Sequence, residues 1–441
     1  MLIPVNRTTV KDIKNPAFAA YAGIYLDIFD DFRKQVERAG VEMEEAQDSS
    51  NRQSIVGGLS VKGATVRNDG KSIYLNQISP ACIACRTGVG TATFFLSLEC
   101  NRNCFYCFNP NQEQYEYYTS NTRDCILELD AIAENNQKLD YIALTGGEPL
   151  LHPEQAIAFV RHARQTFPEA HLRLYTAGDF TDDETLGALR DAGLDEIRYS
   201  IRLHERLEDQ NHTLRQIAQA MEYIPSVMVE MPVLPGTLDR MKEILLELER
   251  IGISSINLLE FCFPFHNART FHEKGYVIKN PPYRVLYNYW YAGGLPIAGS
   301  EEECLQLLDF ALEQNLTIGI HYCSLENKHT GQVYQQDFRA HTPVRAEFSE
   351  KDFFFKTAKV FGDDIPAALN RLREGGIHEY RLDTDLSYLE FHVRHIHLLQ
   401  GLDVELAICT SIMEQREDGE YLRELRVDLS YPDQLDAKKD L

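Results

Sequence analysis

Three closely spaced cysteines are the most reactive feature of this 441-residue sequence. They form the pattern Cys100-x3-Cys104-x2-Cys107, directly after the apolar, strand-like run Thr93–Leu98. Cysteine thiolates are the usual ligands of iron–sulfur clusters. Three of them can hold three irons of a cubane cluster, and the fourth iron stays open to an outside ligand because no fourth cysteine follows at a compatible spacing. A zinc knuckle or three incidental thiols are the alternatives.

A second motif, Gly146-Gly147-Glu148-Pro149, ends the next apolar, strand-like segment, which starts at Tyr141. Paired glycines let the backbone approach a ligand closely, because they have no Cβ atom. The carboxylate of Glu148 can accept a hydrogen bond from an ammonium group. A lone Gly-Gly-Glu means little, but one strand after three spaced cysteines it indicates a cofactor-binding loop.

Together the two motifs resemble the radical S-adenosylmethionine (radical SAM) superfamily, whose cysteine motif has an aromatic residue before the last cysteine, here Tyr106. The resemblance covers roughly Pro80 to Gln335. It implies that Cys100, Cys104 and Cys107 hold a 4Fe–4S cluster whose open iron binds the amino and carboxylate groups of S-adenosylmethionine. One electron then cleaves this cofactor to methionine and a 5′-deoxyadenosyl radical, which is chemistry that the cofactor itself supplies.

The resemblance also implies roles for other residues at strand ends. The loop Gly146, Gly147, Glu148 and Pro149 binds the methionine amino group in this family, and a polar residue at the end of the fourth strand contacts the cofactor. Ser200 and Arg202 share one face there, because side chains alternate along a strand. Arg202 is a candidate to neutralise the methionyl carboxylate, and an ordinary surface salt bridge is its alternative. Tyr106 stacks or hydrogen-bonds near the adenine.

An upstream pair, Cys82-x2-Cys85, has the knuckle spacing of zinc and iron–sulfur sites. Two further ligands are needed, and Cys323 and Cys262 are candidates because both follow predicted strands. Cys82, Cys85 and Cys323 therefore predict an auxiliary iron–sulfur or zinc site. Such a site requires the chain after Cys85 to run up the open edge of a barrel. Buried free thiols are the alternative.

Glu260, His321 and Lys328 fall at or just beyond the late strand ends, and we take them as candidate acid–base groups on the substrate side. His392, His395 and His397 cluster farther on, within a segment with helical spacing, Leu386–Leu399. The first two would share a helix face and could bind a metal. A partly buried helix surface is the favoured interpretation.

The composition is that of an ordinary globular protein, with 44% hydrophobic residues and a net charge of −23. Nucleic-acid binding draws its affinity from Lys and Arg, and no basic cluster stands out, so a nucleic-acid substrate is disfavoured. No apolar run reaches the roughly 18–20 residues that span a membrane, and the N-terminus lacks the pattern of a signal peptide. We expect a cytoplasmic protein whose ten cysteines serve as ligands or free thiols.

The elements that position these residues alternate strand and helix from Thr91 onward, which demands a parallel sheet with right-handed crossovers. Strands are predicted at 93–98, 141–144, 172–176, 196–201, 227–231, 255–261 and 317–322. Helices are predicted at 125–135, 153–167, 182–192, 214–223, 238–250 and 301–313. An aromatic-rich segment, residues 262–299, interrupts the alternation and is either a substrate lid or a satellite core.

The fold class predicted is α/β: a partial parallel (β/α)6 radical SAM barrel at residues 89–336, preceded by an N-terminal cap at 1–88. The cap combines a helix at 15–39 with short strands at 55–67 and 71–75. Residues 340–441 read as an added α+β domain, possibly ferredoxin-like, with a hairpin near its end. Within the superfamily the motifs are similar to proteins related to pyruvate formate-lyase activating enzymes. Simple activating enzymes lack the added domain, which argues against glycyl-radical activation.

The sequence therefore predicts an enzyme that abstracts hydrogen from a small-molecule or peptide substrate. It needs a 4Fe–4S cluster, S-adenosylmethionine and an electron donor such as flavodoxin or ferredoxin. A methyl- or sulfur-transferring radical SAM enzyme is the rival within enzymes. A non-catalytic metal-binding protein is the rival outside them.

Overall fold

The computed structural model describes residues 2–46, 49–287 and 294–441. Their contacts divide the chain into two units, which we call the barrel unit and the terminal unit. The barrel unit contains the described residues of 40–282 and 294–329, and the terminal unit contains 2–39, 283–287 and 330–441. The structure thus divides the segment 1–88, predicted to be a single cap, between the two units.

The barrel unit is built on one sheet, which has nine strands among the described residues. Six parallel strands follow one another in both sequence and space, and a seventh parallel strand, β12, pairs with the last of them. Two antiparallel strands extend the sheet beyond β12. In spatial order the strands are β2 (Thr65–Arg67), β3 (Ser72–Leu75), β12 (Gly319–Cys323), β9 (Ser255–Glu260), β8 (Ser226–Val233), β7 (Glu196–Tyr199), β6 (His171–Thr176), β5 (Tyr141–Thr145) and β4 (Thr91–Phe95).

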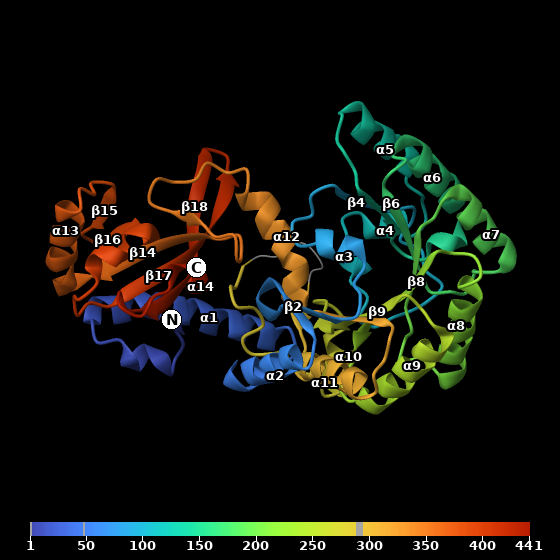
Figure 1. The fold of residues 1–441 in the computed structure, drawn as a ribbon, viewed down its shortest axis with the longest axis horizontal. Coiled ribbons are helices and arrows are strands. Elements are labelled where there is room, and N and C mark those ends of the chain that lie inside the picture. Colours follow the sequence, from blue (N-terminus) through green and yellow to red (C-terminus); the bar gives the residue numbers. More distant parts are fainter. Residues whose placement is uncertain (1, 47–48, 288–293) are drawn as a thin grey trace. The chain divides into compact units, whose positions relative to one another are not determined.

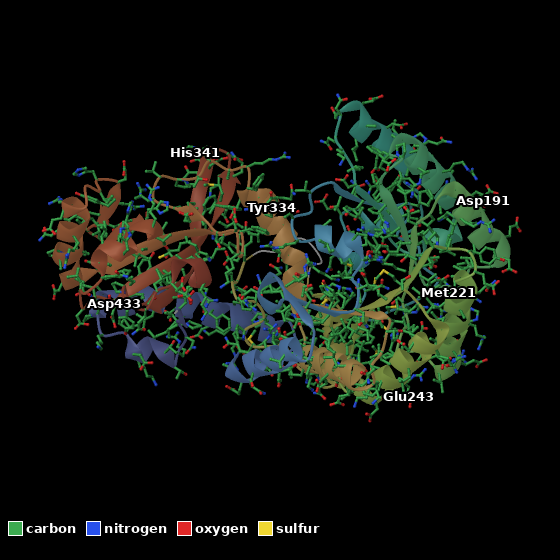
Figure 2. All side chains as sticks on the ribbon, in the orientation of Figure 1. Asp191, Met221, Glu243, Tyr334, His341 and Asp433 are labelled. Carbon is green, nitrogen blue, oxygen red and sulfur yellow. The ribbon has the colours of Figure 1, made fainter. Side chains whose placement is uncertain are left out.

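Helices connect these strands and cover one face of the sheet (Figure 1). Their buried side chains pack with alternate strand residues into one apolar core. Asp191 and Glu243, labelled in Figure 2, are exposed on the outer side of this layer. The covering helices are α5 (Cys125–Glu134), α6 (Pro153–Thr166), α7 (Asp183–Ala192), α8 (Leu207–Ala220), α9 (Leu238–Ile251) and α11 (Ser300–Glu313). The predicted α/β fold with a parallel sheet is confirmed.

The strand residues that belong to the apolar core show which side chains face the helices and which face the inside of the barrel. On β6, Leu172 and Leu174 belong to the core under the helices, so the intervening Arg173 and its neighbours His171 and Tyr175 face the inside of the barrel. The same alternation applies along the sheet and gives the barrel a polar interior, which we call the lumen. Its inward residues include Glu196, Arg198, Glu230, Asn257 and His321.

Within the barrel unit, two described α-helices precede the first parallel strand. The segment predicted as a strand at 55–67 is wrong over most of its length, because α2 (Ser49–Val61) is a helix and only β2 is extended. Leu59 of α2 is buried in the barrel core. The short helix α3 (Pro80–Ala84) follows the β2–β3 hairpin and carries Cys82. The shorter elements of this unit are α4 (Tyr115–Tyr118), α10 (Ala268–Glu273), β10 (Cys262–Phe263) and β11 (Leu295–Pro296).

The terminal unit contains a second sheet, antiparallel at every described pairing. Taken from β14 onward, the order β17-β14-β16-β15, with helices in the two crossovers, is that of interleaved β-α-β units. The strands are β1 (Ile3–Pro4), β13 (Glu347–Phe348), β14 (Phe355–Phe361), β15 (Tyr380–Asp383), β16 (Tyr388–His392), β17 (Leu406–Arg416) and β18 (Gly419–Ser430), and the helices are α1 (Pro16–Arg38), α12 (Leu325–Asp337, which begins in the barrel unit), α13 (Ile365–Glu374) and α14 (Ala437–Asp440).

The N-terminal helix α1 belongs to this unit because its apolar face packs on the second sheet. The ring of Phe18 stacks on that of Phe361 with 5.0 Å between centroids. The helix predicted at 386–399 is wrong: its first part is β16, paired on both sides, and Val393–Leu399 is a 3-10 helix. His392 therefore ends a strand and shares no helix face with His395. No helix in the described part of the chain combines the length and apolar composition needed to cross a membrane.

Candidate active site

The three-cysteine loop begins where β4 ends, at the carboxyl edge of the parallel sheet, where catalytic loops of parallel barrels lie. Cys100 is exposed, and Cys104 and Cys107 are partly buried. The amide of Cys107 donates to the carbonyl of Cys104 at 3.0 Å, which closes a turn between them. Burial raises the pKa of all three thiols, that of Cys104 to about 12. Binding of iron must therefore displace their protons.

Two carboxylates that follow neighbouring strands fasten this loop. Asp179, after β6, accepts hydrogen bonds from Asn101 Nδ2 and Arg102 Nε, both at 2.7 Å. Although burial opposes the charge of Asp179, these bonds and the Arg102 cation hold its pKa below the usual value. Glu205, after β7, pairs with Arg102 at 3.3 Å and with Arg202 at 3.1 Å. Sequence analysis missed Asp179 and Glu205, and their places just beyond strand ends were the available signal.

The glycine pair Gly146-Gly147 lies against the backbone of the cysteine loop. The amide of Gly147 donates to Ser97 O at 3.0 Å, and that of Glu148 donates to Glu99 O at 2.8 Å. A Cβ atom on Gly147 would lie 1.8 Å from Glu99 O, and one on Gly146 (φ +116°) would lie 2.5 Å from Ser97 O. The glycines are therefore required for contact between the two loops.

The carboxylate of Glu148 is buried and fully engaged by the protein. It accepts from Leu150 N at 3.0 Å, Thr176 Oγ1 at 2.8 Å and Ala177 N at 2.6 Å. Burial raises its pKa despite these bonds. Glu148 thus joins its loop to the end of β6, and Pro149 begins a single 3-10 turn beside it. This geometry differs from the predicted acceptor of an ammonium group.

The remaining predicted cofactor residues lie beside the loop. Arg202 is 4% exposed and donates to Ala177 O at 3.2 Å as well as to Glu205, so it is not on the surface. Ser200 is partly buried just after β7. The Tyr106 ring lies 5.2 Å from that of His204, whose buried Nδ1 has no hydrogen-bond partner among the described residues. An unpaired polar atom at this place suits a polar cofactor.

Aromatic side chains from the 262–299 segment and its flank pack on the cysteine loop. Phe261 lies 5.5 Å from Tyr106, and Phe271 lies 5.4 Å from Phe105, centroid to centroid. Asn267 Nδ2 also donates to Phe105 O at 2.9 Å. This part of the segment is a packed layer that supports the loop. Residues 288–293 lie outside the described part of the chain.

The lumen beneath these loops holds a connected polar network. Arg198 pairs with Glu196 and with Glu230, each at 2.6 Å. Asn257 donates to Glu230 at 2.7 Å and to the sulfur of Cys82 at 3.3 Å. The contact with Cys82 places α3 against the inward face of the strands. Interiors of ordinary βα barrels are filled by branched apolar residues, so this one is suited to a polar ligand.

Two of the three predicted acid–base residues are hydrogen-bonded to other groups of the protein. Glu260 accepts from Lys279 Nζ and Leu325 N, both at 2.8 Å. Both ring nitrogens of His321 are hydrogen-bonded, to Asn257 and to Ser72, each at 2.9 Å, and burial lowers its pKa to about 3. Both groups therefore have protein partners in this structure, and their acid–base roles stay predictions. Lys328, by contrast, has no hydrogen bond or ion pair within the described residues.

Cys85 and Cys82 both act electrostatically on the Cys323 thiol, whose pKa burial raises to about 12, so the predicted auxiliary ligands lie in one region of the barrel unit. In the described ranges, however, no three His, Cys, Asp or Glu side chains converge on one metal ion. The structure therefore gives no support to a zinc ion at Cys82, Cys85 and Cys323. The same result does not argue against a cluster at the three-cysteine loop, because in a cubane each thiolate binds a different iron and the three need not converge on one ion.

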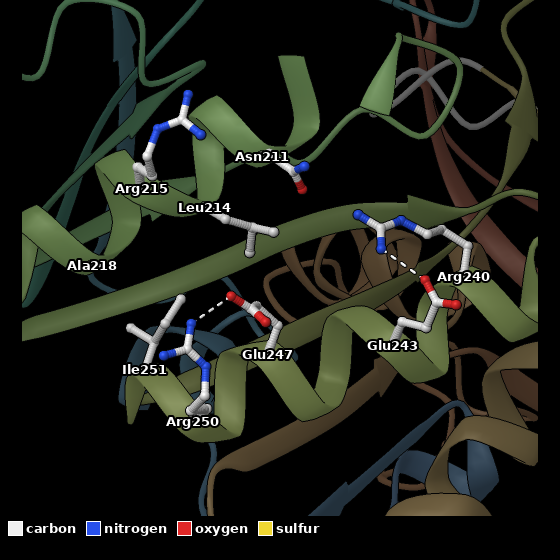
Figure 3. Close-up of a pocket in the computed structure, with 9 residues that line it drawn as sticks. All are labelled: Asn211, Leu214, Arg215, Ala218, Arg240, Glu243, Glu247, Arg250 and Ile251. Atoms are coloured by element: carbon white, nitrogen blue, oxygen red, sulfur yellow. Dashed lines mark hydrogen bonds and ion pairs between the residues drawn. The ribbon is translucent and has the colours of Figure 1, made fainter. Parts of the chain in front are cut away.

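A surface groove lies between α8 and α9 (Figure 3). It is lined by ion pairs within α9, Arg240–Glu243 at 2.8 Å and Arg250–Glu247 at 2.6 Å. It lies in the helical layer, away from the carboxyl ends of the strands, and contains no nucleophile. We do not assign the active site to it.

A sequence profile of the radical SAM superfamily matches residues 95–248. A putative glycyl-radical enzyme activating enzyme of Methanocaldococcus jannaschii is 27% identical over 256 residues, which cover 56% of this chain and 64% of that protein. Among solved structures, Streptococcus suis SuiB bound to S-adenosylmethionine is similar at 9% identity, with a TM-score of 0.38 over 54% of this chain and 50% of SuiB. Escherichia coli coproporphyrinogen III oxidase has a TM-score of 0.35 at 12% identity, over 54% and 56% of the two chains.

Proposed function

We propose that this enzyme, whose residues 95–248 match the radical SAM superfamily profile, reductively cleaves S-adenosylmethionine and abstracts hydrogen from a substrate bound in the barrel lumen. One observation carries the proposal. The three-cysteine loop is hydrogen-bonded to the Gly-Gly-Glu-Pro loop, at the carboxyl end of a barrel whose interior is polar.

In this proposal Cys100, Cys104 and Cys107 hold a 4Fe–4S cluster. Its donor set is appropriate, because three partly accessible thiols on one loop leave one iron open. The bound cluster would supply the electron that cleaves S-adenosylmethionine to methionine and a 5′-deoxyadenosyl radical. A one-electron donor such as flavodoxin or ferredoxin restores that electron.

The neighbouring residues would bind and orient the cofactor. The Gly146–Gly147 backbone and Pro149 border the three-cysteine loop, which itself carries Tyr106, and Ser200 and Arg202 lie beside it. Arg202 offers a buried cation for the methionyl carboxylate, while Glu205 and Ala177 O fix its orientation. Glu148 does not contact the cofactor in this proposal. Its carboxylate holds the Gly-Gly-Glu-Pro loop in place.

The substrate is a small molecule or a peptide segment, since the lumen carries polar groups on several strands. The M. jannaschii relative favours a second candidate, removal of a hydrogen atom from a glycine of a partner protein. This chain spans 64% of that relative's length. A methyl or sulfur transfer is distinguished from both by its products, since the transferred group stays on the substrate.

The test is anaerobic reconstitution with iron and sulfide, followed by reduction with dithionite in the presence of S-adenosylmethionine. We expect 5′-deoxyadenosine and methionine in equal amounts. Intact S-adenosylmethionine after full reconstitution would contradict the proposal. Transfer of deuterium from a candidate substrate into 5′-deoxyadenosine would then identify the substrate.

A further inference from the structure

Two cationic side chains that face the interior of the barrel unit have no ion pair with a carboxylate among the described residues. They are Arg173 on β6 and Lys328 on α12, which follows β12. Both side chains are partly buried, and a charge withdrawn from water without a partner is costly, so their presence requires an explanation. The protein as a whole carries a net charge of −23, so a general excess of basic residues does not explain these two cations.

Arg173 faces the lumen because its strand neighbours Leu172 and Leu174 are in the core. Its Nε and Nη1 atoms are buried and have no hydrogen-bond partner in the described part of the chain. The carboxylate nearest in register, Glu196, is already paired with Arg198. The guanidinium therefore has unused donors on the side chain that faces the lumen.

Lys328 is partly buried on the first turn of α12, directly after β12. Glu230 is the strongest charge acting on it and keeps its pKa raised in spite of burial. Glu230 itself is bound by Arg198 at 2.6 Å and by Asn257 at 2.7 Å. The ammonium group is thus left charged and available.

Both cations act on the same thiol, that of Cys85, whose pKa burial raises. They therefore lie within electrostatic range of one point at the end of α3. Apart from histidines, the network has three cations (Arg173, Arg198, Lys328) and two carboxylates (Glu196, Glu230), and both carboxylates are bound to Arg198. The surplus is one positive charge.

We infer that Arg173 and Lys328 bind an anionic group of the substrate, a carboxylate or a phosphate, beside Cys85 in the lumen. The inference rests on the proposed function in so far as it identifies the ligand as substrate. Arginine offers a planar fork of donors and lysine a compact charge, a combination that suits either anion. The anion would balance the surplus charge and fill the unused donors.

Equilibrium dialysis tests the inference on reconstituted protein without reductant or S-adenosylmethionine. Radiolabelled inorganic phosphate and radiolabelled succinate are used in separate arms at constant ionic strength, which distinguishes the two kinds of anion. We expect one of them to bind at one equivalent per chain. Lys328→Gln and Arg173→Gln should each weaken this binding by about tenfold or more, because each removes a charged hydrogen-bond donor.

Lys138→Gln is the matched control, since Lys138 is exposed and paired with Asp140, and its binding should equal that of the unaltered protein. Lys328→Arg and Arg173→Lys keep the charge and should retain most of the affinity, even where a glutamine variant fails to fold. Failure of both anions to bind saturably to the unaltered protein would overturn the inference, as would undiminished binding in both glutamine variants. Cleavage of S-adenosylmethionine by the same preparation is measured separately, so loss of anion binding alone leaves the proposed function standing.

Discussion

Substitution of Gly147 by alanine should separate the two loops that form the candidate cofactor site. The new Cβ atom would lie 1.8 Å from Glu99 O and 2.7 Å from Leu98 C. These are backbone atoms, so no side-chain rotation relieves the clash. Since a close C···O contact is about 3.3 Å, the loops must move apart by roughly 1.5 Å.

Such a movement would break the bonds from Gly147 N to Ser97 O and from Glu148 N to Glu99 O, now 3.0 and 2.8 Å long. Both donor–acceptor distances would exceed 4 Å, beyond a normal hydrogen bond. Each broken bond leaves a donor or acceptor unpaired in a buried place, which costs about 1–3 kcal/mol. The expected loss is about 2–6 kcal/mol, concentrated at the site.

The assay is the iron content after anaerobic reconstitution, together with the yield of 5′-deoxyadenosine. We expect Gly147→Ala to lose most of both while its secondary structure by circular dichroism is unchanged. Gly187→Ala is the matched control, because a Cβ atom there meets only Tyr223 Cε1, at 3.9 Å, and alanine favours the helix α7. Normal iron content and normal cleavage in Gly147→Ala would refute the claim that this contact positions the two loops.

Three further substitutions test other parts of the account. Glu148→Ala should lower the melting temperature as well as cofactor affinity, because three donors lose their acceptor; a weaker affinity at unchanged stability would instead indicate a direct contact with the cofactor. Asp179→Ala should speed the loss of cluster iron to a chelator by releasing Arg102, and Asp183→Ala, at the start of α7, should not. Burial raises the pKa of Asp337 in the terminal unit to about 8, so the folded chain holds a proton there that the unfolded chain releases near pH 4. The stability that this proton contributes is complete below about pH 4 and is lost as the pH rises toward 8; Asp337→Asn should flatten the decline in chemical-denaturation midpoint over this range, and an unaltered decline would contradict the assignment.

The parallel strands and the helices between them were predictable because their apolar residues recur at the spacing typical of buried strands and amphipathic helices. The predicted strand 141–144 and helix 238–250 differ from β5 and α9 by one residue at one end. The helix α2 was missed because Gly57 and Gly58 have low helix propensity. Tertiary contacts override this, since Leu59 is buried and Arg52 pairs with Glu301 at 2.7 Å.

The helix predicted at 386–399 was wrong for a different reason. Its apolar residues fit a helix, yet β16 lies between β14 and β15 and is covered on both faces, so alternation is not visible in the sequence. Val393, Ile396 and Leu399 repeat every three residues, which is the period of the 3-10 helix found there.

At the site, spacing along the chain identified the candidate ligands but could not show what else each group binds. Nothing local to Glu148 indicates that Thr176 and Ala177 occupy its carboxylate. The same holds for Glu260 and Lys279. Asp179 and Glu205 act on a loop far from them in sequence. Such pairings depend on the barrel closing around them, and only a structure shows them.

The central claim is that the three-cysteine loop holds a cluster that cleaves S-adenosylmethionine. The most direct measurement compares the unaltered protein with its Cys100/Cys104/Cys107→Ala variant after identical anaerobic reconstitution and reduction with dithionite. The account predicts about four irons per chain and formation of 5′-deoxyadenosine in the unaltered protein, and neither in the variant. Cleavage by the variant, or none by a fully reconstituted unaltered protein, would contradict it.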